Sequence, residues 1–213
     1  QFNLGCLYRD GQGVDKDEKH AVELYTLASE QGHAGAQYNL GIMYEDGQGV
    51  DKDEKRAVEL YTLAADQGHA DAQYYLGIMY KNGRGADKDE KRAVEVFTLA
   101  ANQGNVEAQF DLGIMYDCGR GVDKDQNRAF ELYTLAADQD HAQAQYNVGA
   151  MYCNGTCKNV GKSLTKAREW ISKAASQGFE QAINALKQLD QIEGRTTTTS
   201  STVNSNTAFC SYC

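Results

Sequence analysis

The chain has 213 residues, 41% of them hydrophobic and 24% charged, a composition typical of a globular protein that excludes a wholly disordered chain. Its 30 Asp and Glu residues outnumber its 21 Lys and Arg residues, and the net charge of −9 argues against a nucleic-acid partner, which is bound by clustered cations. No apolar run is long enough to insert into a membrane, and the combination of 21 glycines with no proline predicts helices that end at glycine.

A 36-residue unit repeats along the whole length of the predicted fold. Its clearest columns are a glycine and, three residues later, a tyrosine. They are Gly5, Gly41, Gly77, Gly113 and Gly149, followed by Tyr8, Tyr44, Tyr80, Tyr116 and Tyr152. A fixed period of this length indicates a repeat architecture. The first repeat starts inside a helix at Gln1, the equivalent of Gln37, so we expect further sequence upstream.

Each repeat is predicted to hold two amphipathic helices joined by a loop. In the repeat at residues 70–105 the helices cover 70–81 and about 88–103, and Gly83 and Gly104 follow them as stop signals. The expected buried positions are Gln73, Leu76, Gly77 and Tyr80 on the first helix, then Ala93, Val96, Phe97, Ala100 and Ala101 on the second. Neither helix can bury its apolar side alone, so we expect helix hairpins that stack on one another.

Two residue types in the repeat are assigned a structural role. Asp87 precedes the second helix, with Glu90 three residues later as in a capping box, so N-capping is predicted for it and for Asp51 and Asp123. A glycine in the middle of a helix costs about 1 kcal/mol relative to alanine. The recurrence of Gly77 in every repeat therefore predicts a close approach of the backbone of a neighbouring helix.

The predicted solenoid covers residues 1–192 and ends in a capping helix at 179–192. Its repeats are 1–33, which is truncated, then 34–69, 70–105, 106–141 and 142–179. The remaining segment, 193–213, is rich in Ser and Thr and has no apolar period, so it is predicted to be a disordered tail.

These motifs resemble the Sel1-like repeat family, which is related to the tetratricopeptide repeats. The resemblance is carried by residues 72–80, 82–85, 91–94 and 100–104, which read AQYYLGIMY, NGRG, KRAV and AANQG. It implies an all-α fold, a right-handed α-α superhelix of antiparallel helix hairpins. It also implies a non-enzymatic scaffold or adaptor that assembles or regulates other proteins.

Two motifs that are similar to reactive sites have simpler structural explanations. Ser163-Leu-Thr-Lys166 matches a motif of penicillin-recognising enzymes whose partner motifs are missing, and it is interpreted as the first turn of a helix. His33, His69 and His141 occupy equivalent positions on successive repeats, too far apart to share one metal ion. No catalytic residue, metal site or cofactor is therefore predicted.

The six cysteines leave alternatives open. Cys153 and Cys157, and likewise Cys210 and Cys213, are close enough in sequence to be free, disulfide-bonded or bound to zinc. No cysteine pair recurs in every repeat, which favours a cytoplasmic location.

A partner is predicted to bind on one face of the first helices. Across the repeats this face carries an aromatic residue flanked by polar residues that vary, a combination typical of interfaces. The candidates are Tyr38, Asn39, Glu45, Asp71, Tyr74, Tyr75, Lys81, Glu107, Phe110, Asp111, Asp117, Gln143, Tyr146 and Asn147. In the alternative interpretation the aromatic residues pack between neighbouring hairpins and only the variable positions meet solvent. Periodicity does not decide between the two.

The predicted function is protein–protein interaction without catalysis, with a peptide or a domain as the partner. The acidic chain favours a partner with basic patches. The alternatives are the regulatory repeat region of a larger enzyme and a small-ligand binder or hydrolase. The small-ligand alternative would require a deep pocket lined by converging titratable groups. The oligomeric state is not predicted.

Overall fold

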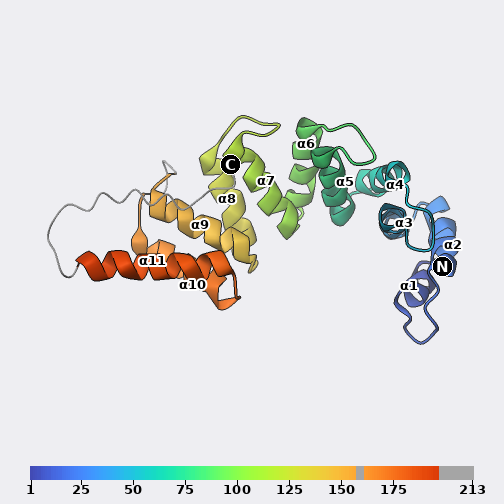
Figure 1. Cartoon of the computed structure of the whole chain (residues 1–213). Helices are drawn as coiled ribbons and strands as arrows, with labels where there is room; N and C mark the ends of the chain where they lie inside the picture. The colour runs from blue at the N-terminus through green and yellow to red at the C-terminus, as the bar shows by residue number, and fades with distance from the viewer. Residues whose placement is uncertain (157–160, 197–213) are drawn as a thin grey trace. The chain divides into compact units, whose positions relative to one another are not determined.

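The computed structural model describes residues 1–156 and 161–196, with side chains as far as residue 191 (Figure 1). Over these residues the chain forms eleven α-helices and no strand, which confirms the predicted all-α class. The helices are α1 (Phe2–Asp10), α2 (Glu18–Glu30), α3 (Ala34–Asp46), α4 (Glu54–Asp66), α5 (Ala70–Asn82), α6 (Glu90–Asn102), α7 (Val106–Cys118), α8 (Gln126–Ala137), α9 (Ala142–Asn154), α10 (Leu164–Ser176) and α11 (Glu180–Thr196).

The chain divides into two compact units, Gln1–Ala108 and Gln109–Cys213, called here the first and the second half. In the first half each helix from α1 to α5 contacts the next one along the chain. In the second half α8 contacts α9, α9 contacts α10 and α10 contacts α11. Contacts between helices that are neighbours in sequence are the pattern of a helical solenoid.

Two predicted helix boundaries differ from the structure by more than one residue. The second helix of the repeat at 70–105 begins at Glu90 instead of residue 88. The last helix continues to Thr196, so residues 193–196 of the predicted tail are helical. The rest of that predicted tail, 197–213, lies outside the described residues.

The N-caps of the second helices are not the predicted aspartates. Asp89 has an extended backbone with φ of −142°, and its Oδ1 accepts hydrogen bonds from the N–H groups of Lys91 and Arg92 at 3.1 and 3.0 Å. The equivalent residues that cap α2, α4 and α8 are Asp17, Asp53 and Asp125. The prediction for Asp51, Asp87 and Asp123 was therefore wrong by two residues, because the carboxylate must lie directly before the first free N–H groups of the helix.

Each mid-helix glycine lies under a buried side chain of the second helix. A Cβ atom on Gly77 would lie 2.5 Å from Cε1 of Phe97, whose side chain is fully buried. Tyr25, Tyr61 and Tyr133 take the same place opposite the glycines of their own repeats. The predicted close approach exists, and at these four glycines a ring of the partner helix makes it, whereas at Gly149 it is made by the Ile171 side chain and the backbone oxygen of Ala167.

In the repeats at 34–69, 70–105 and 142–179 a buried glutamine in the first helix joins the repeat to the one before it. Gln73 is 3% exposed; its Oε1 accepts a hydrogen bond from Nε2 of Gln103 at 2.7 Å, and its Nε2 donates to the carbonyl oxygen of Ala65 at 3.1 Å. Ala65 belongs to the second helix of the preceding repeat. Gln37 and Gln145 make the same two bonds in their repeats. The polar member of the predicted core stripe is therefore a hydrogen-bonded tie between repeats.

Arg84 connects the same two repeats by ion pairs. Its guanidinium lies 3.0 Å from Oε1 of Glu45 and 3.0 Å from Oε1 of Glu54, and it lowers the pKa of the Glu54 carboxyl by hydrogen bonding. The hydroxyl of Tyr61 donates to the other carboxylate oxygen of Glu45 at 2.6 Å. Gln48 holds the equivalent position one repeat earlier, so the preceding junction lacks this arginine.

The recurring histidines are N-caps of the first helices. Nδ1 of His69 accepts a hydrogen bond from the N–H of Ala72 at 3.3 Å, and His33 and His141 cap α3 and α9 in the same way at 3.1 Å. Asn105 replaces histidine in one repeat, and its Oδ1 accepts from the N–H of Ala108 at 2.8 Å. The column therefore conserves a hydrogen-bond acceptor and not a particular ring.

Replacing His69 with alanine is expected to lower the free energy of unfolding by about 1 kcal/mol, because the N–H of Ala72 loses its capping acceptor. His69→Asn should stay within about 0.5 kcal/mol of the natural chain, since asparagine caps the equivalent position at residue 105. Urea denaturation followed by circular dichroism measures both variants. Equal losses in the two variants would mean that the ring, not the cap, carries the stabilisation.

Candidate partner-binding face

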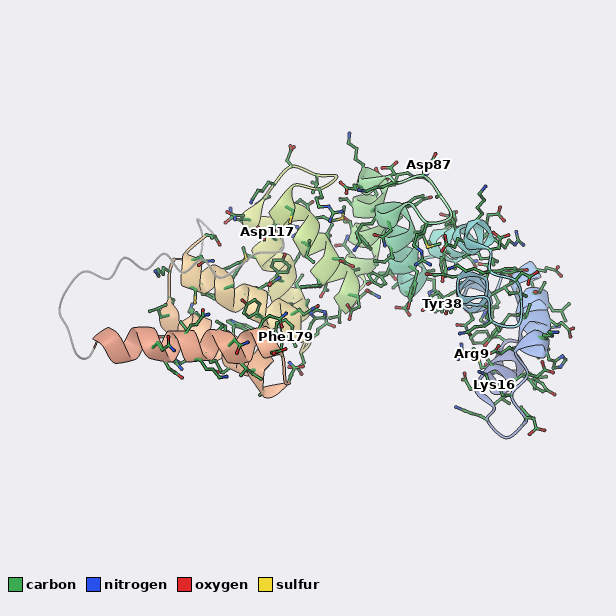
Figure 2. The ribbon with its side chains drawn as sticks, viewed as in Figure 1. Arg9, Lys16, Tyr38, Asp87, Asp117 and Phe179 are labelled. Carbon is green, nitrogen blue, oxygen red and sulfur yellow. The ribbon has the colours of Figure 1, made fainter. Side chains whose placement is uncertain are left out.

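Four tyrosines form a contact cluster in the first half, and we call Tyr38, Tyr61, Tyr74 and Tyr75 the tyrosine cluster. Tyr38 on α3, labelled in Figure 2, has its ring centroid 6.1 Å from that of Tyr61 and 5.6 Å from that of Tyr75. Tyr75 also lies 5.5 Å from Tyr74 and 5.7 Å from Tyr61. Tyr61 is buried, whereas the other three remain partly exposed on α3 and α5. The cluster thus combines one buried ring, that of Tyr61, with three rings that are accessible to solvent.

Burial changes the acidity of the clustered phenols. Burial is the main cause that raises the pKa of Tyr38, and the neighbouring Tyr75 and Asp71 raise it further. The pKa of Tyr61 is also raised, first by burial and then by its hydrogen bond to the Glu45 carboxylate. These hydroxyls therefore remain protonated donors at neutral pH and offer no nucleophile.

The polar candidates of the first half differ in accessibility. Asp71 is exposed, and its Oδ1 accepts a hydrogen bond from Nδ2 of Asn105 at 2.9 Å. Lys81 is half-buried, with Nζ 5.7 Å from the centre of the Phe97 ring. Asn39 and Glu45 are each only 9% exposed. Glu107, at the start of α7, is exposed.

The candidates of the second half are more deeply packed. Phe110 is 7% exposed, with its ring 4.4 Å from His141 and 5.8 Å from Tyr133. Tyr146 is partly exposed and lies 5.6 Å from Phe179. The remaining candidates are Asp117 and Asn147, which are buried, and Asp111 and Gln143, which are half-buried.

The structure thus brings together only part of the predicted face. Tyr38, Tyr74, Tyr75 and Asp71 are accessible in the first half, while Asn39, Glu45, Phe110, Asp117 and Asn147 have little surface to offer a partner. The alternative interpretation, in which the aromatic residues pack between neighbouring hairpins, fits Phe110. It also fits Tyr38, because the Tyr38 ring stacks on the His69 ring of the next repeat with centroids 4.8 Å apart. Partner binding by this face stays a prediction.

Sequence reasoning missed Tyr61 as a member of the cluster. It assigned the second helix only a packing role, although the aromatic column Tyr25, Tyr61, Phe97 and Tyr133 lies in register with the mid-helix glycines. That register was the available signal.

The motifs considered for catalysis or metal binding have structural roles among the described residues. Oγ of Ser163 accepts a hydrogen bond from the N–H of Lys166 at 3.3 Å and caps α10, as its interpretation as a first turn implies. Cys153 is a free thiol, so it is not bridged to Cys157, and burial raises its pKa to about 11. Cys118 takes part in a disulfide, which the sequence did not predict. Within 1–156 and 161–196 there is no group of three or more His, Cys, Asp or Glu residues placed to hold a metal ion.

The 157–160 segment and the residues after 196 contain Cys157, Cys210 and Cys213, so the predicted pairs that include them lie outside the described residues.

None of the helices in the described part of the chain has the length and apolar character required to span a membrane.

The repeat sequence matches a known family model along most of the chain. The Sel1 repeat model fits residues 1–33, 34–69, 70–105, 106–141 and 142–179. The chain belongs to the Sel1 repeat family. This confirms the resemblance recognised in the sequence. Sel1 repeat proteins generally mediate protein–protein interactions, and their scaffold is typically non-enzymatic.

Solved Sel1 repeat structures support the solenoid fold. The protective antigen c5321, present in uropathogenic Escherichia coli strains, is 33% identical with a TM-score of 0.81, and the match covers 85% of this chain. The chain spans 38% of the length of the c5321 chain. A Sel1 repeat protein from Oxalobacter formigenes is 35% identical with a TM-score of 0.79 over 88% of this chain and 76% of that one. The immunity protein Pa5087 from Pseudomonas aeruginosa is 27% identical with a TM-score of 0.52, and the match covers 85% of this chain and 69% of that one. No curated protein matches the chain.

Proposed function

We propose that this Sel1 repeat chain is a non-enzymatic scaffold that binds a partner protein or peptide on the face of its first helices. The tyrosine cluster carries the proposal. Three of its rings are partly exposed, and all of them rest on neighbouring rings that hold their positions. A tyrosine that is already immobilised loses little conformational freedom on binding, and aromatic residues dominate interface energies.

The chemistry around the cluster favours a basic partner. Asp71 is exposed at the start of α5, Glu107 is exposed at the start of α7, and the chain carries a net charge of −9. Acidic groups around an aromatic anchor accelerate the encounter with lysine- or arginine-bearing surfaces and reject acidic ones. The proposed partner is therefore a peptide or domain whose contact surface combines an apolar side chain with basic neighbours.

Quantitative affinity capture tests this face. The triple variant Asp71→Lys, Tyr75→Ala, Glu107→Lys is expected to retain its partners at least tenfold less well than the natural chain, because it loses an aromatic anchor and reverses two exposed charges of the first half. Partner amounts are compared by mass spectrometry after capture at equal bait concentration, and circular dichroism checks that each bait is folded.

A matched control separates the face from net charge. The variant Asp15→Lys, Asp123→Lys makes the same change in charge on two exposed loop residues away from the first helices. It should retain the partners of the natural chain. Equal capture by the folded triple variant, or equal losses in both variants, would refute the proposed face.

A further inference from the structure

A row of exposed leucines recurs on the second helices. Leu27 on α2, Leu63 on α4 and Leu99 on α6 are 46%, 49% and 52% exposed. We call these three residues of the first half the leucine row. Leu135 holds the same position in the next repeat and is 49% exposed. Leucine half-exposed at one fixed position of four consecutive repeats is a pattern, unlike the scattered apolar residues of an ordinary surface.

Packing within the fold does not account for these leucines. The fifth repeat has Lys173 at the equivalent position, and α10 still forms with its N-cap in place. Nζ of Lys173 lies 4.0 Å from the centre of the Trp170 ring, at the surface. Nε2 of Gln67 donates a hydrogen bond to the carbonyl oxygen of Leu63 at 3.2 Å. This bond involves the backbone of Leu63 and not its side chain. The fold therefore accommodates a charged side chain at this position.

Acidic residues flank the row. Glu30 follows Leu27 by three residues and Asp66 follows Leu63 by three, so each lies on the same side of its helix as that leucine. Both carboxylates are exposed. Glu95, four residues before Leu99, is exposed as well. The apolar row thus has an acidic border, which complements a basic surface and repels an acidic one.

We propose that the leucine row is a second docking surface, which takes an amphipathic helix of a partner protein with aliphatic residues on one side and lysine or arginine beside them. Packed helices lie about 8–10 Å apart, so leucines on successive second helices are at least that far from one another. Two turns of an α-helix rise about 11 Å, so aliphatic residues seven apart on a crossing helix have a spacing just above this lower limit. The surface lies on the second helices and does not depend on the face proposed above for the first helices.

A synthetic probe tests the proposal directly with the full chain. The probe is a fluorescein-labelled 22-residue helical peptide that carries leucine at every seventh position and lysines beside each leucine. Fluorescence anisotropy should show saturable binding to the natural chain. The variant Leu63→Gln, Leu99→Gln, which leaves the net charge unchanged, should bind the peptide at least tenfold more weakly. The variant Glu30→Gln, Asp66→Asn should also bind it more weakly, by about threefold to tenfold.

Three controls make the result decisive. The loop variant Asp15→Asn, Asp51→Asn removes the same two charges away from the row and should bind like the natural chain. Tyr75→Ala measures separately how much of the probe binds to the first-helix face. A peptide with glutamate in place of lysine should bind at least tenfold more weakly. Circular dichroism verifies folding, and if the glutamine variant unfolds, Leu63→Lys, which copies the fifth repeat, replaces it.

Several outcomes would overturn the inference. They are the absence of saturable binding to the natural chain, unchanged binding by the folded leucine variant, and equal binding of the lysine and glutamate peptides. Sedimentation analysis adds one more. If the natural chain is a dimer and the leucine variant a monomer, the row is covered by a second copy, and the proposed occupant is wrong.

Discussion

Gly77→Ala is expected to lower the free energy of unfolding by about 2 kcal/mol, although alanine is the better helix former. The new Cβ would lie 2.5 Å from the Phe97 ring, closer than carbon atoms approach in proteins. Phe97 is fully buried, so its ring has no free space into which to move. The cost of overpacking, about 1–3 kcal/mol, therefore exceeds the gain of up to about 1 kcal/mol in helix propensity. Urea denaturation followed by circular dichroism measures the difference.

A double-mutant cycle isolates the contact responsible. In a Phe97→Ala background the same Gly77→Ala substitution should become neutral or stabilising, because the ring that it meets is gone. Gly161→Ala is the control for alanine substitution as such, since a Cβ there meets no atom within 4 Å. An unchanged or increased stability of Gly77→Ala in the natural background would contradict the steric explanation.

Gln73→Leu is expected to cost about 2 kcal/mol, even though it makes a buried position more apolar. The side-chain amide of Gln73 bonds the Ala65 carbonyl oxygen of the preceding repeat and the Gln103 side chain. Leucine removes both side-chain bonds, each worth about 0.5–1.5 kcal/mol net, although the Ala65 carbonyl keeps its backbone bond from the N–H of Gly68 at 2.9 Å. Native-state hydrogen exchange should also show faster exchange at the junction between α4 and α5.

Gln103 provides the matched comparison for Gln73. In Gln103→Leu only the bond to Oε1 of Gln73 is lost and the bond of Gln73 to Ala65 stays, so this variant should cost about 1 kcal/mol. Equal losses for Gln73→Leu and Gln103→Leu would show that the buried tie to Ala65 contributes nothing of its own. A larger loss for Gln103→Leu than for Gln73→Leu would contradict the hydrogen bonds that we describe between the repeats.

Sequence reasoning reached the repeat fold because the signals involved are local. The mid-helix glycine, the apolar stripe and the stop glycine each depend on spacing within one repeat, and the helices lie where these signals predict them. The N-caps show where local reasoning fails. Asp87 and Asp89 have the same chemistry, and only the position of the first helical turn decides that Asp89 accepts the hydrogen bonds.

The candidate face was predicted less well than the fold. Asn39, Glu45 and Asp117 lie on the predicted face, yet each is nearly buried in the structure. A helical period identifies the buried stripe, but it does not set how far the neighbouring helices cover the positions beside it. Glu45 is covered in this way because its carboxylate contacts the guanidinium of Arg84 in the next repeat and the hydroxyl of Tyr61 on the paired helix.

The amino-acid sequence by itself determined the family, the repeat length and the order of the helices, because these follow from periodic patterns that each repeat carries complete. The tertiary structure alone decided that Gln73 ties two repeats together, that Tyr61 supports Tyr38 and Tyr75, and that the leucines of the second helices stay half-exposed. Each of these depends on contacts between residues far apart along the chain, and such contacts exist only after the hairpins have stacked.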